Sequence, residues 1–208
     1  MYPFLRMGLE AWAARKAPAI GFLDEHVSQH RCWPWDLDPW IELNNGRTLT
    51  LYDLGRVPMG LRTGLAPVLR KKGWGMTVAG SSLRYRRRVR AFDRITMRSR
   101  GIGWDARFLY IEQSMWVRGD CTSHMLLRSA VTSPGGIVPP AQVAAALGQP
   151  PDSPPLPAWV AAWIAATGSS LPEFTVWVPR PSPWPQIPGG PPRGGGGQPP
   201  PAATSESR

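Results

Sequence analysis

Cysteine is scarce in this sequence: only Cys32 and Cys121 occur among its 208 residues. Two thiols cannot form the disulfide framework of a small secreted domain, and no C-x-x-C pair is present to bind zinc. The three histidines, His26, His30 and His124, also lack the spacing of metal ligands. We therefore expect free thiols in a reducing compartment, the cytoplasm, and no metal or other cofactor.

Long apolar runs are missing as well. No uninterrupted stretch approaches the roughly 20 residues that a helix needs to cross a bilayer. Residues 1–21 place Arg6, Glu10, Arg15 and Lys16 among apolar residues, which is not the order of a secretory signal. The pattern predicts a short amphipathic helix that packs on the domain. Peripheral contact with a membrane surface is the alternative interpretation.

Acidic residues are outnumbered, since 24 lysines and arginines face 14 aspartates and glutamates. The formal charge of +10 favours anionic partners, which are nucleic acid, anionic lipid or a phosphate-bearing small molecule. Charge alone does not choose among them. Within the arginine-rich stretch 84–100, Tyr85 and Phe92 are the only aromatic residues. The sequence therefore shows no periodic array of aromatic rings on which nucleic-acid bases could stack.

Apolar residues make up 42% of the chain, enough for one packed core. A helix is expected from Asn45 to Val57, where Pro58 should interrupt it, and a second helical piece runs to about Lys72. Strands are predicted over His26 to Trp33, 74–92, 94–104, 107–117 and 121–132, with a hairpin turn at Gly119-Asp120. Apolar residues on both faces of 107–117 indicate a central strand.

This order of elements predicts an α+β fold in which an antiparallel sheet wraps around a long central helix. The domain is expected over residues 22–148, after the amphipathic segment 1–21. A Pro-rich linker and a short helix follow over 149–179. The Pro- and Gly-rich tail, 180–208, is predicted to be disordered. Because a sheet edge needs a partner, we expect a homodimer or a dimer of dimers.

A distinctive segment precedes the predicted central helix: Trp35-Asp36-Leu37-Asp38 leads to Asn44-Asn45-Gly46-Arg47. It resembles the signature of the hotdog-fold acyl-CoA thioesterases of the thioesterase-like superfamily. In that family Asp-x-Asp is followed by a histidine, one spacer and Asn-Asn. Residues 85–92 and 103–113 are similar to the same family. The resemblance covers residues 20–148 and implies a single hotdog domain that hydrolyses an acyl-CoA without a cofactor.

The resemblance also implies catalytic roles. Asp38 takes the position of the carboxylate that acts as general base or nucleophile, and backbone amides at the helix start, near Asn45, would hold the carbonyl oxygen. Glu42 stands where the family has histidine. Two carboxylates would then share the acid and base roles, or the site would bind without turnover. Structural interpretations remain open beside these: Asp38 shapes a turn, and Asn44 or Asn45 caps the helix.

The substrate-binding residues that the resemblance implies are Asn44, Gly46, Arg47, Arg86 and Arg88. Arginines recur with period two at 84, 86, 88 and 90, so they would share one strand face. That face would hold the phosphates of coenzyme A or would simply be solvated. The leading function is therefore an acyl-CoA thioesterase. The alternatives are a non-catalytic hotdog protein that binds acyl groups or an acyl-carrier partner and, least expected, a nucleic-acid-binding module.

Overall fold

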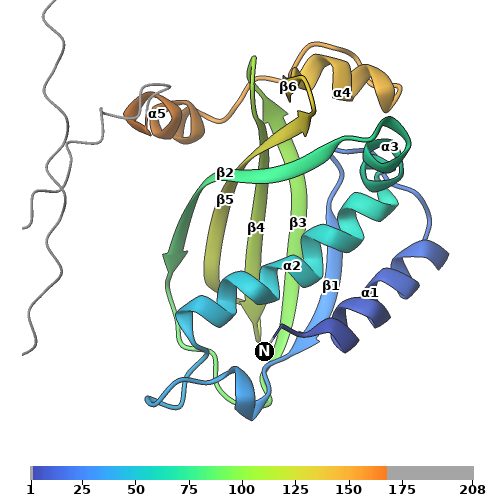
Figure 1. Ribbon diagram of the computed structural model, residues 1–208. Helices are drawn as coiled ribbons and strands as arrows, with labels where there is room; N and C mark the ends of the chain where they lie inside the picture. The colour runs from blue at the N-terminus through green and yellow to red at the C-terminus, as the bar shows by residue number, and fades with distance from the viewer. Residues whose placement is uncertain (1, 168–208) are drawn as a thin grey trace, which may run out of the picture. The chain divides into compact units, whose positions relative to one another are not determined.

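The structure is a computed structural model that describes residues 2–167. Residues up to Ile164 form one structural unit. A curled antiparallel sheet packs against one long helix, α2 (Asn45–Arg62), as Figure 1 shows. This is the α+β arrangement that the order of elements predicts, and it matches the hotdog fold that the resemblance implies. The tail predicted to be disordered, 180–208, lies outside the described residues.

The sheet has the strand order β1-β3-β4-β5-β2, and every pairing is antiparallel. Its strands are β1 (His26–Arg31), β2 (Gly75–Tyr85), β3 (Arg94–Trp104), β4 (Leu109–Val117) and β5 (Asp120–Ser133). A short strand that the sequence did not predict, β6 (Gly136–Val138), pairs with the end of β5. β4 lies in the middle of the order, as its two apolar faces indicate. β1 and β2 are the two edges.

The hairpin between β4 and β5 is tight. Val117 pairs with Asp120, and the two residues between them, Arg118 and Gly119, have positive φ angles of 54° and 88°. Two-residue turns with positive φ match the right-handed twist of paired strands. The predicted hairpin is confirmed, with the turn one residue earlier than Gly119-Asp120.

Helix α2 begins where the side chain of Asn44 accepts a hydrogen bond from the backbone N–H of Arg47 (3.0 Å). Asn44 is thus the predicted N-cap. The predicted stop before Pro58 is wrong, because α2 continues to Arg62. A proline φ suits a helix, but the ring removes the bond to the carbonyl four residues earlier and crowds that carbonyl. Pro58 is buried with Met59, so packing offsets that loss.

The core forms where α2 crosses the sheet. Tyr52 and the apolar residues of α2 pack on the facing strands: Leu51, Leu54 and Met59 meet Ile95, Met97, Ile111, Met115, Met125 and Leu127. Gly55 permits the close approach, because a Cβ there would lie 2.7 Å from Ser99 Oγ and 2.5 Å from Met97 Sδ. The helix is therefore fixed in depth and register over β3.

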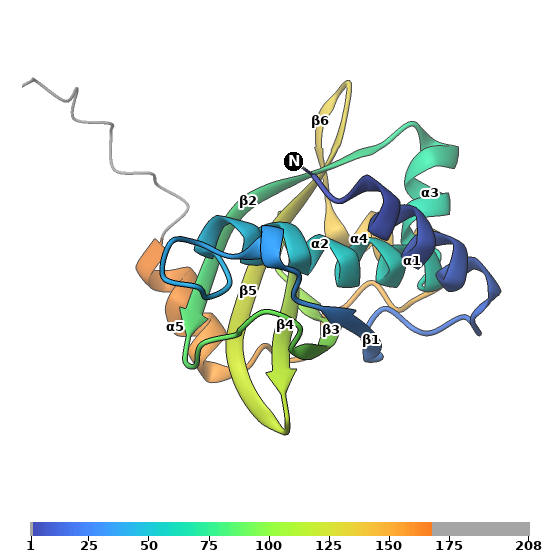
Figure 2. The same cartoon turned by 90° about the horizontal axis from the view of Figure 1, so that it is seen from below.

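The remaining helices cover both faces of the sheet. Helices α1 (Phe4–Lys16) and α3 (Leu65–Lys72) lie on the same face as α2 (Figure 2). Helix α4 (Pro140–Ala146) contributes Val143 and Ala144 to a second apolar cluster with Phe22 and Trp104. On the opposite face, Val160 of α5 (Ala158–Thr167) packs with three residues of the sheet: Ile102, Tyr110 and Leu126.

Candidate functional site

Asp36, the first aspartate of the motif, is a structural centre. Its side chain is fully buried and accepts hydrogen bonds from Arg6 Nη1 (2.8 Å), Arg47 Nε (2.7 Å) and the Trp33 amide (3.0 Å). One carboxylate thus joins α1, the short 3₁₀ turn η1 (Pro34–Asp36) and the first turn of α2. Arg47, predicted to bind substrate, directs its Nε to this ion pair.

Asp38, the second aspartate, shapes the turn that follows. Its Oδ1 accepts hydrogen bonds from the amides of Trp40 (2.9 Å) and Glu42 (3.4 Å). The Asp38 amide also donates to the Glu42 carbonyl (2.8 Å), and Ile41 between them has a φ of 60°. The turn-forming interpretation therefore has direct structural support. The catalytic role of Asp38 stays a prediction.

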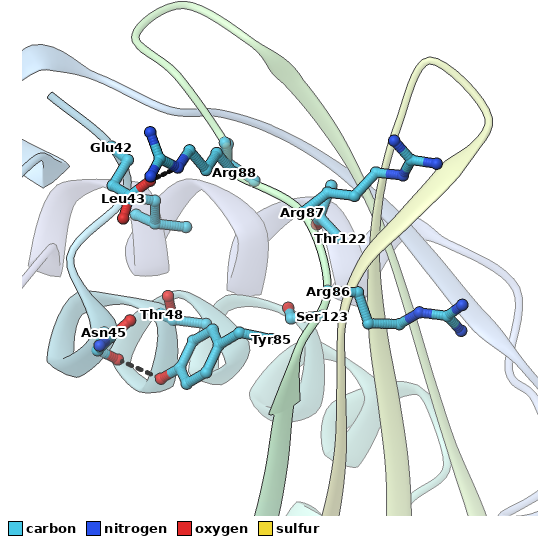
Figure 3. Close-up of a pocket in the computed structure, with 11 residues that line it drawn as sticks. Glu42, Leu43, Asn45, Thr48, Tyr85, Arg86, Arg87, Arg88, Thr122 and Ser123 are labelled. Carbon is cyan, nitrogen blue, oxygen red and sulfur yellow. Dashed lines mark hydrogen bonds and ion pairs between the residues drawn. The ribbon is translucent and has the colours of Figure 1, made fainter. Parts of the chain in front are cut away.

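The turn delivers Glu42 to a cavity of about 240 Å³. The start of α2, the loop after β2 and the start of β5 enclose it (Figure 3). Its lining residues are Glu42, Leu43, Asn45, Thr48, Tyr85, Arg86, Arg87, Arg88, Val89, Thr122 and Ser123. We call this space the α2 cavity. Four predicted site residues meet here: Glu42, Asn45, Arg86 and Arg88. Asp38, Asn44, Gly46 and Arg47 do not line it.

Glu42 and Arg88 form an ion pair in the wall of the α2 cavity. Arg88 Nε lies 2.8 Å from Glu42 Oε2, although the angle does not give a straight hydrogen bond. In Figure 3 the side chain of Arg88 points toward Glu42, whereas those of Arg86 and Arg87 point away from it. Within the arginine run, Arg88 is thus the residue aimed at the carboxylate.

The arginine run is not a strand face, contrary to the prediction. β2 ends at Tyr85, and the amides of Arg86 and Arg87 both donate to the Thr122 carbonyl (2.8 and 3.1 Å). Two amides that share one acceptor break the alternation of a ladder, so the period-two pattern is lost. Arg86 and the arginines after it lie in the loop between β2 and β3.

Hydroxyl groups line the α2 cavity, and no sequence motif singles them out. Tyr85 Oη donates to the Asn45 carbonyl (3.0 Å), and Tyr52 Oη lies 2.8 Å from Ser123 Oγ. Burial raises the pKa of Tyr52 and of Tyr85, so both remain protonated donors at neutral pH. Thr48, one turn into α2, is buried beside them. The sole sequence signal was the position of Tyr85 beside the arginines.

The first amides of α2 are free to bind an acceptor. Asn44 takes the Arg47 amide with its side chain and the Thr48 amide with its carbonyl (2.8 Å). Within residues 2–167, the amides of Asn45 and Gly46 donate to no other group. Free N–H groups and the helix dipole favour negative charge at this end. Asn45 borders the α2 cavity, so that charge would lie beside Glu42.

A second polar cluster lies away from the α2 cavity. Glu112 Oε2 accepts from Arg100 Nη2 (2.7 Å), and His124 Nε2 lies 2.8 Å from Glu112 Oε1. The hydrogen bond with His124, aided by Arg100, lowers the pKa of Glu112 to about 2. Glu112 is thus a paired acid. Burial and the nearby Arg62 lower the pKa of His26 to about 4.

Neither a metal site nor a membrane-spanning helix is found in the part of the chain that the structure describes. No three histidine, cysteine or acidic side chains there are grouped so that they could hold a metal ion. None of the described helices has both the length and the apolar character to span a bilayer.

Comparison with known proteins identifies relatives of this chain. The family model of the thioesterase-like superfamily matches residues 32–164. Protein THEM6 of Xenopus laevis is 32% identical over 170 residues, which cover 80% of this chain and 81% of that protein. The probable thioesterase YbaW of Escherichia coli is similar in fold, with a TM-score of 0.56 and 15% identity over 59% of this chain and 96% of that one. Slr0204 of Synechocystis, a 1,4-dihydroxy-2-naphthoyl-CoA thioesterase, has a TM-score of 0.53 and 9% identity over 60% and 95%.

Proposed function

Because the chain belongs to the thioesterase-like superfamily, we propose that it hydrolyses an acyl-CoA to the free acid and coenzyme A. One observation carries the proposal: a carboxylate, Glu42, and Asn45, whose backbone amide is free, line one cavity. Ester hydrolysis needs a base for water and donors for the oxygen that becomes negative. The α2 cavity supplies both.

The reaction follows from these positions. The thioester carbonyl oxygen accepts a hydrogen bond from the free amide of Asn45, where the helix dipole stabilises the developing charge. Glu42 removes a proton from the water that attacks the carbonyl carbon. The carbon–sulfur bond then breaks, and the proton passes to the departing sulfur. Arg88 positions the Glu42 carboxylate through the ion pair.

The arginines of the loop after β2 supply the binding of coenzyme A. Guanidinium groups recognise phosphates through paired, charge-assisted hydrogen bonds. Arg86 and Arg87 point away from Glu42 and remain exposed, so they can hold phosphates outside the reacting centre (Figure 3). Asp38 contributes in this scheme by fixing the turn that carries Glu42, and its direct role as a base is the second possibility for this site.

The test is hydrolysis of a panel of acyl-CoAs, followed by thiol release. We expect the wild type to cleave at least one member and Glu42→Gln to lower kcat by about 100-fold or more, the usual contribution of a general base. Asp38→Asn should lower kcat less if it only supports the turn. Glu25→Gln is the control, because Glu25 forms an exposed ion pair with Arg98 outside the cavity. A wild type that cleaves no acyl-CoA, or a fully active Glu42→Gln, would contradict the proposal.

A second candidate is a non-catalytic hotdog protein that binds an acyl group or an acyl-carrier partner. Glu42 in place of the family histidine favours it, since the ion pair with Arg88 already engages the carboxylate. An acyl-CoA or an acyl-carrier protein would then raise the melting temperature without thiol release. Steady-state release of thiol excludes this candidate.

We also propose a cellular compartment and an oligomeric state for the enzyme. Cys32 and Cys121 are free thiols, which suits the reducing cytoplasm. The exposed edge strand β2 suits a homodimer.

A further inference from the structure

Helix α1 packs on the domain through Met7 and Ala14 and also through two charged side chains. Arg6 donates to the buried Asp36 (2.8 Å) and to the Arg31 carbonyl (2.8 Å). Glu10 Oε1 lies 3.4 Å from Nδ1 of the buried His30. Ala14 is the one buried residue of the helix. A surface helix normally buries its apolar stripe, whereas α1 leaves most of its large apolar side chains exposed.

Four large apolar residues of α1 face away from the domain. The exposed fractions are 73% for Phe4, 86% for Leu5, 68% for Leu9 and 59% for Trp12. Positions i, i+1, i+5 and i+8 share one side of a helix. Trp35, exposed by 67%, lines a hollow of about 610 Å³ together with Phe4 and Leu5. We call these five side chains the α1 surface.

Basic residues continue this surface at the end of the helix. Arg15 and Lys16 are exposed in the last turn, and Lys16 Nζ lies 3.6 Å from the centre of the Trp12 ring. The only acidic residue of α1, Glu10, is turned toward His30. The outward side of α1 thus combines large apolar and aromatic residues with positive charge and carries no acid.

We propose that the α1 surface binds the interface of an anionic lipid bilayer. Interfacial helices have this composition: apolar and aromatic side chains enter the boundary of the acyl chains, while lysine and arginine contact acidic headgroups. The chain charge of +10 acts in the same direction. A protein partner would match the apolar residues but would not in itself require the basic end. Contiguous exposed apolar surface of this kind marks an interaction site in either case.

The α1 surface adjoins the start of α2. The hollow that Phe4, Leu5 and Trp35 line is also lined by Asn44 and Arg47, the cap and first turn of α2. A bilayer bound at α1 would therefore lie beside the segment that borders the α2 cavity. Membrane binding is independent of the proposed hydrolysis, because no residue of the α1 surface lines that cavity.

The experiment is vesicle flotation with the full chain. Two vesicle types are compared: phosphatidylcholine mixed with phosphatidylglycerol, and phosphatidylcholine alone. We expect binding to the anionic vesicles that weakens with added salt, and loss of about tenfold or more of the affinity in the double variant Leu5→Glu/Leu9→Glu. Arg15→Glu/Lys16→Glu should lose the preference for anionic vesicles. Ile137→Glu, in the exposed part of β6, is the control and should bind like the wild type.

Melting temperatures verify that the variants fold, which exposed positions should permit. Absence of wild-type binding to anionic vesicles overturns the proposal, as does equal binding by Leu5→Glu/Leu9→Glu. Light scattering tests whether the α1 surface binds a second copy of the chain and not a bilayer. The proposal fails if the wild type does not bind vesicles and Leu5→Glu/Leu9→Glu changes the mass of the assembly. The α1 surface is then a contact between copies of the chain.

Discussion

Two aspartates two residues apart in one motif have different roles. Asp36 is buried and bonded to Arg6 and Arg47, whereas Asp38 turns the backbone so that Glu42 enters the α2 cavity. The motif predicted that α2 would follow it, which is confirmed, but it did not separate these roles. The partners of Asp36 lie 30 residues before it and 11 after it, and no local pattern encodes such contacts.

The carboxylate of Glu112 gives a prediction at the same scale. Its pKa is lowered from 4.5 to about 2 in the folded protein. Ionised Glu112 therefore stabilises the fold at every pH above the pKa that it has in the unfolded chain. That stabilisation is lost as the pH falls from about 4.5 to 2. We expect Glu112→Gln to lower the free energy of unfolding by about 1–2 kcal/mol near pH 6. The difference from the wild type should vanish toward pH 2.

Urea unfolding at a series of pH values measures this difference. Glu25→Gln, which removes an exposed ion pair with Arg98, should change the free energy of unfolding little at any pH. A gap between Glu112→Gln and the wild type that is independent of pH would show that the charge of Glu112 is not the cause.

At the scale of elements, most helices and strands could be predicted from the sequence. The bounds of β3 match the predicted strand 94–104, and the apolar residues on both faces of β4 predicted its central place. The errors share one cause, which is tertiary contact overriding a local rule. Packing carries α2 through Pro58, and the Thr122 carbonyl ends β2 before the arginine run. The orientation of α1 was equally out of reach, because its polar partners come from distant segments.

The two glycines of α2 test how closely this helix approaches the sheet. A Cβ at Gly55 would meet Met97 and Ser99 at less than 3 Å, whereas a Cβ at Gly60 would meet no atom within 4 Å. Alanine favours a helix over glycine by about 1 kcal/mol, and overpacking costs about 1–3 kcal/mol. We therefore expect Gly60→Ala to stabilise the protein and Gly55→Ala to destabilise it.

Thermal and urea unfolding of the two variants measure these changes in the free energy of unfolding. The paired design cancels the effect of helix propensity, since both substitutions lie in one helix. Similar changes in the free energy of unfolding would mean that α2 adjusts its distance from β3 without cost.

At the scale of the whole molecule, β2 is the strand through which two copies of the chain would pair. It is an edge of the sheet, and its residues Met76 and Val78 are exposed where they line a hollow of about 330 Å³. Edge strands that lack a partner are normally protected by charge or by a neighbour. Here apolar side chains occupy the position, which supports the proposed homodimer.

We predict that Val78→Lys separates the dimer and Val27→Lys does not. The two valines are exposed by 53% and 47%, and they lie on opposite edges, β2 and β1. A lysine at the contact would place a charge against apolar surface. Size-exclusion chromatography with light scattering should give twice the mass of one chain for the wild type. A monomeric wild type, or dissociation by Val27→Lys alone, excludes pairing through β2.

The position of α1 and α2 on one face of the sheet has a consequence for such a pair (Figure 2). Antiparallel pairing of two β2 strands about a two-fold axis keeps one continuous sheet, so the helices of both copies lie on its same side. Two α1 surfaces would then face one bilayer, and the second would bind at a high effective concentration. Avidity would make vesicle affinity depend on assembly. Val78→Lys, which leaves every residue of the α1 surface intact, should then bind vesicles more weakly than Val27→Lys in the same flotation experiment.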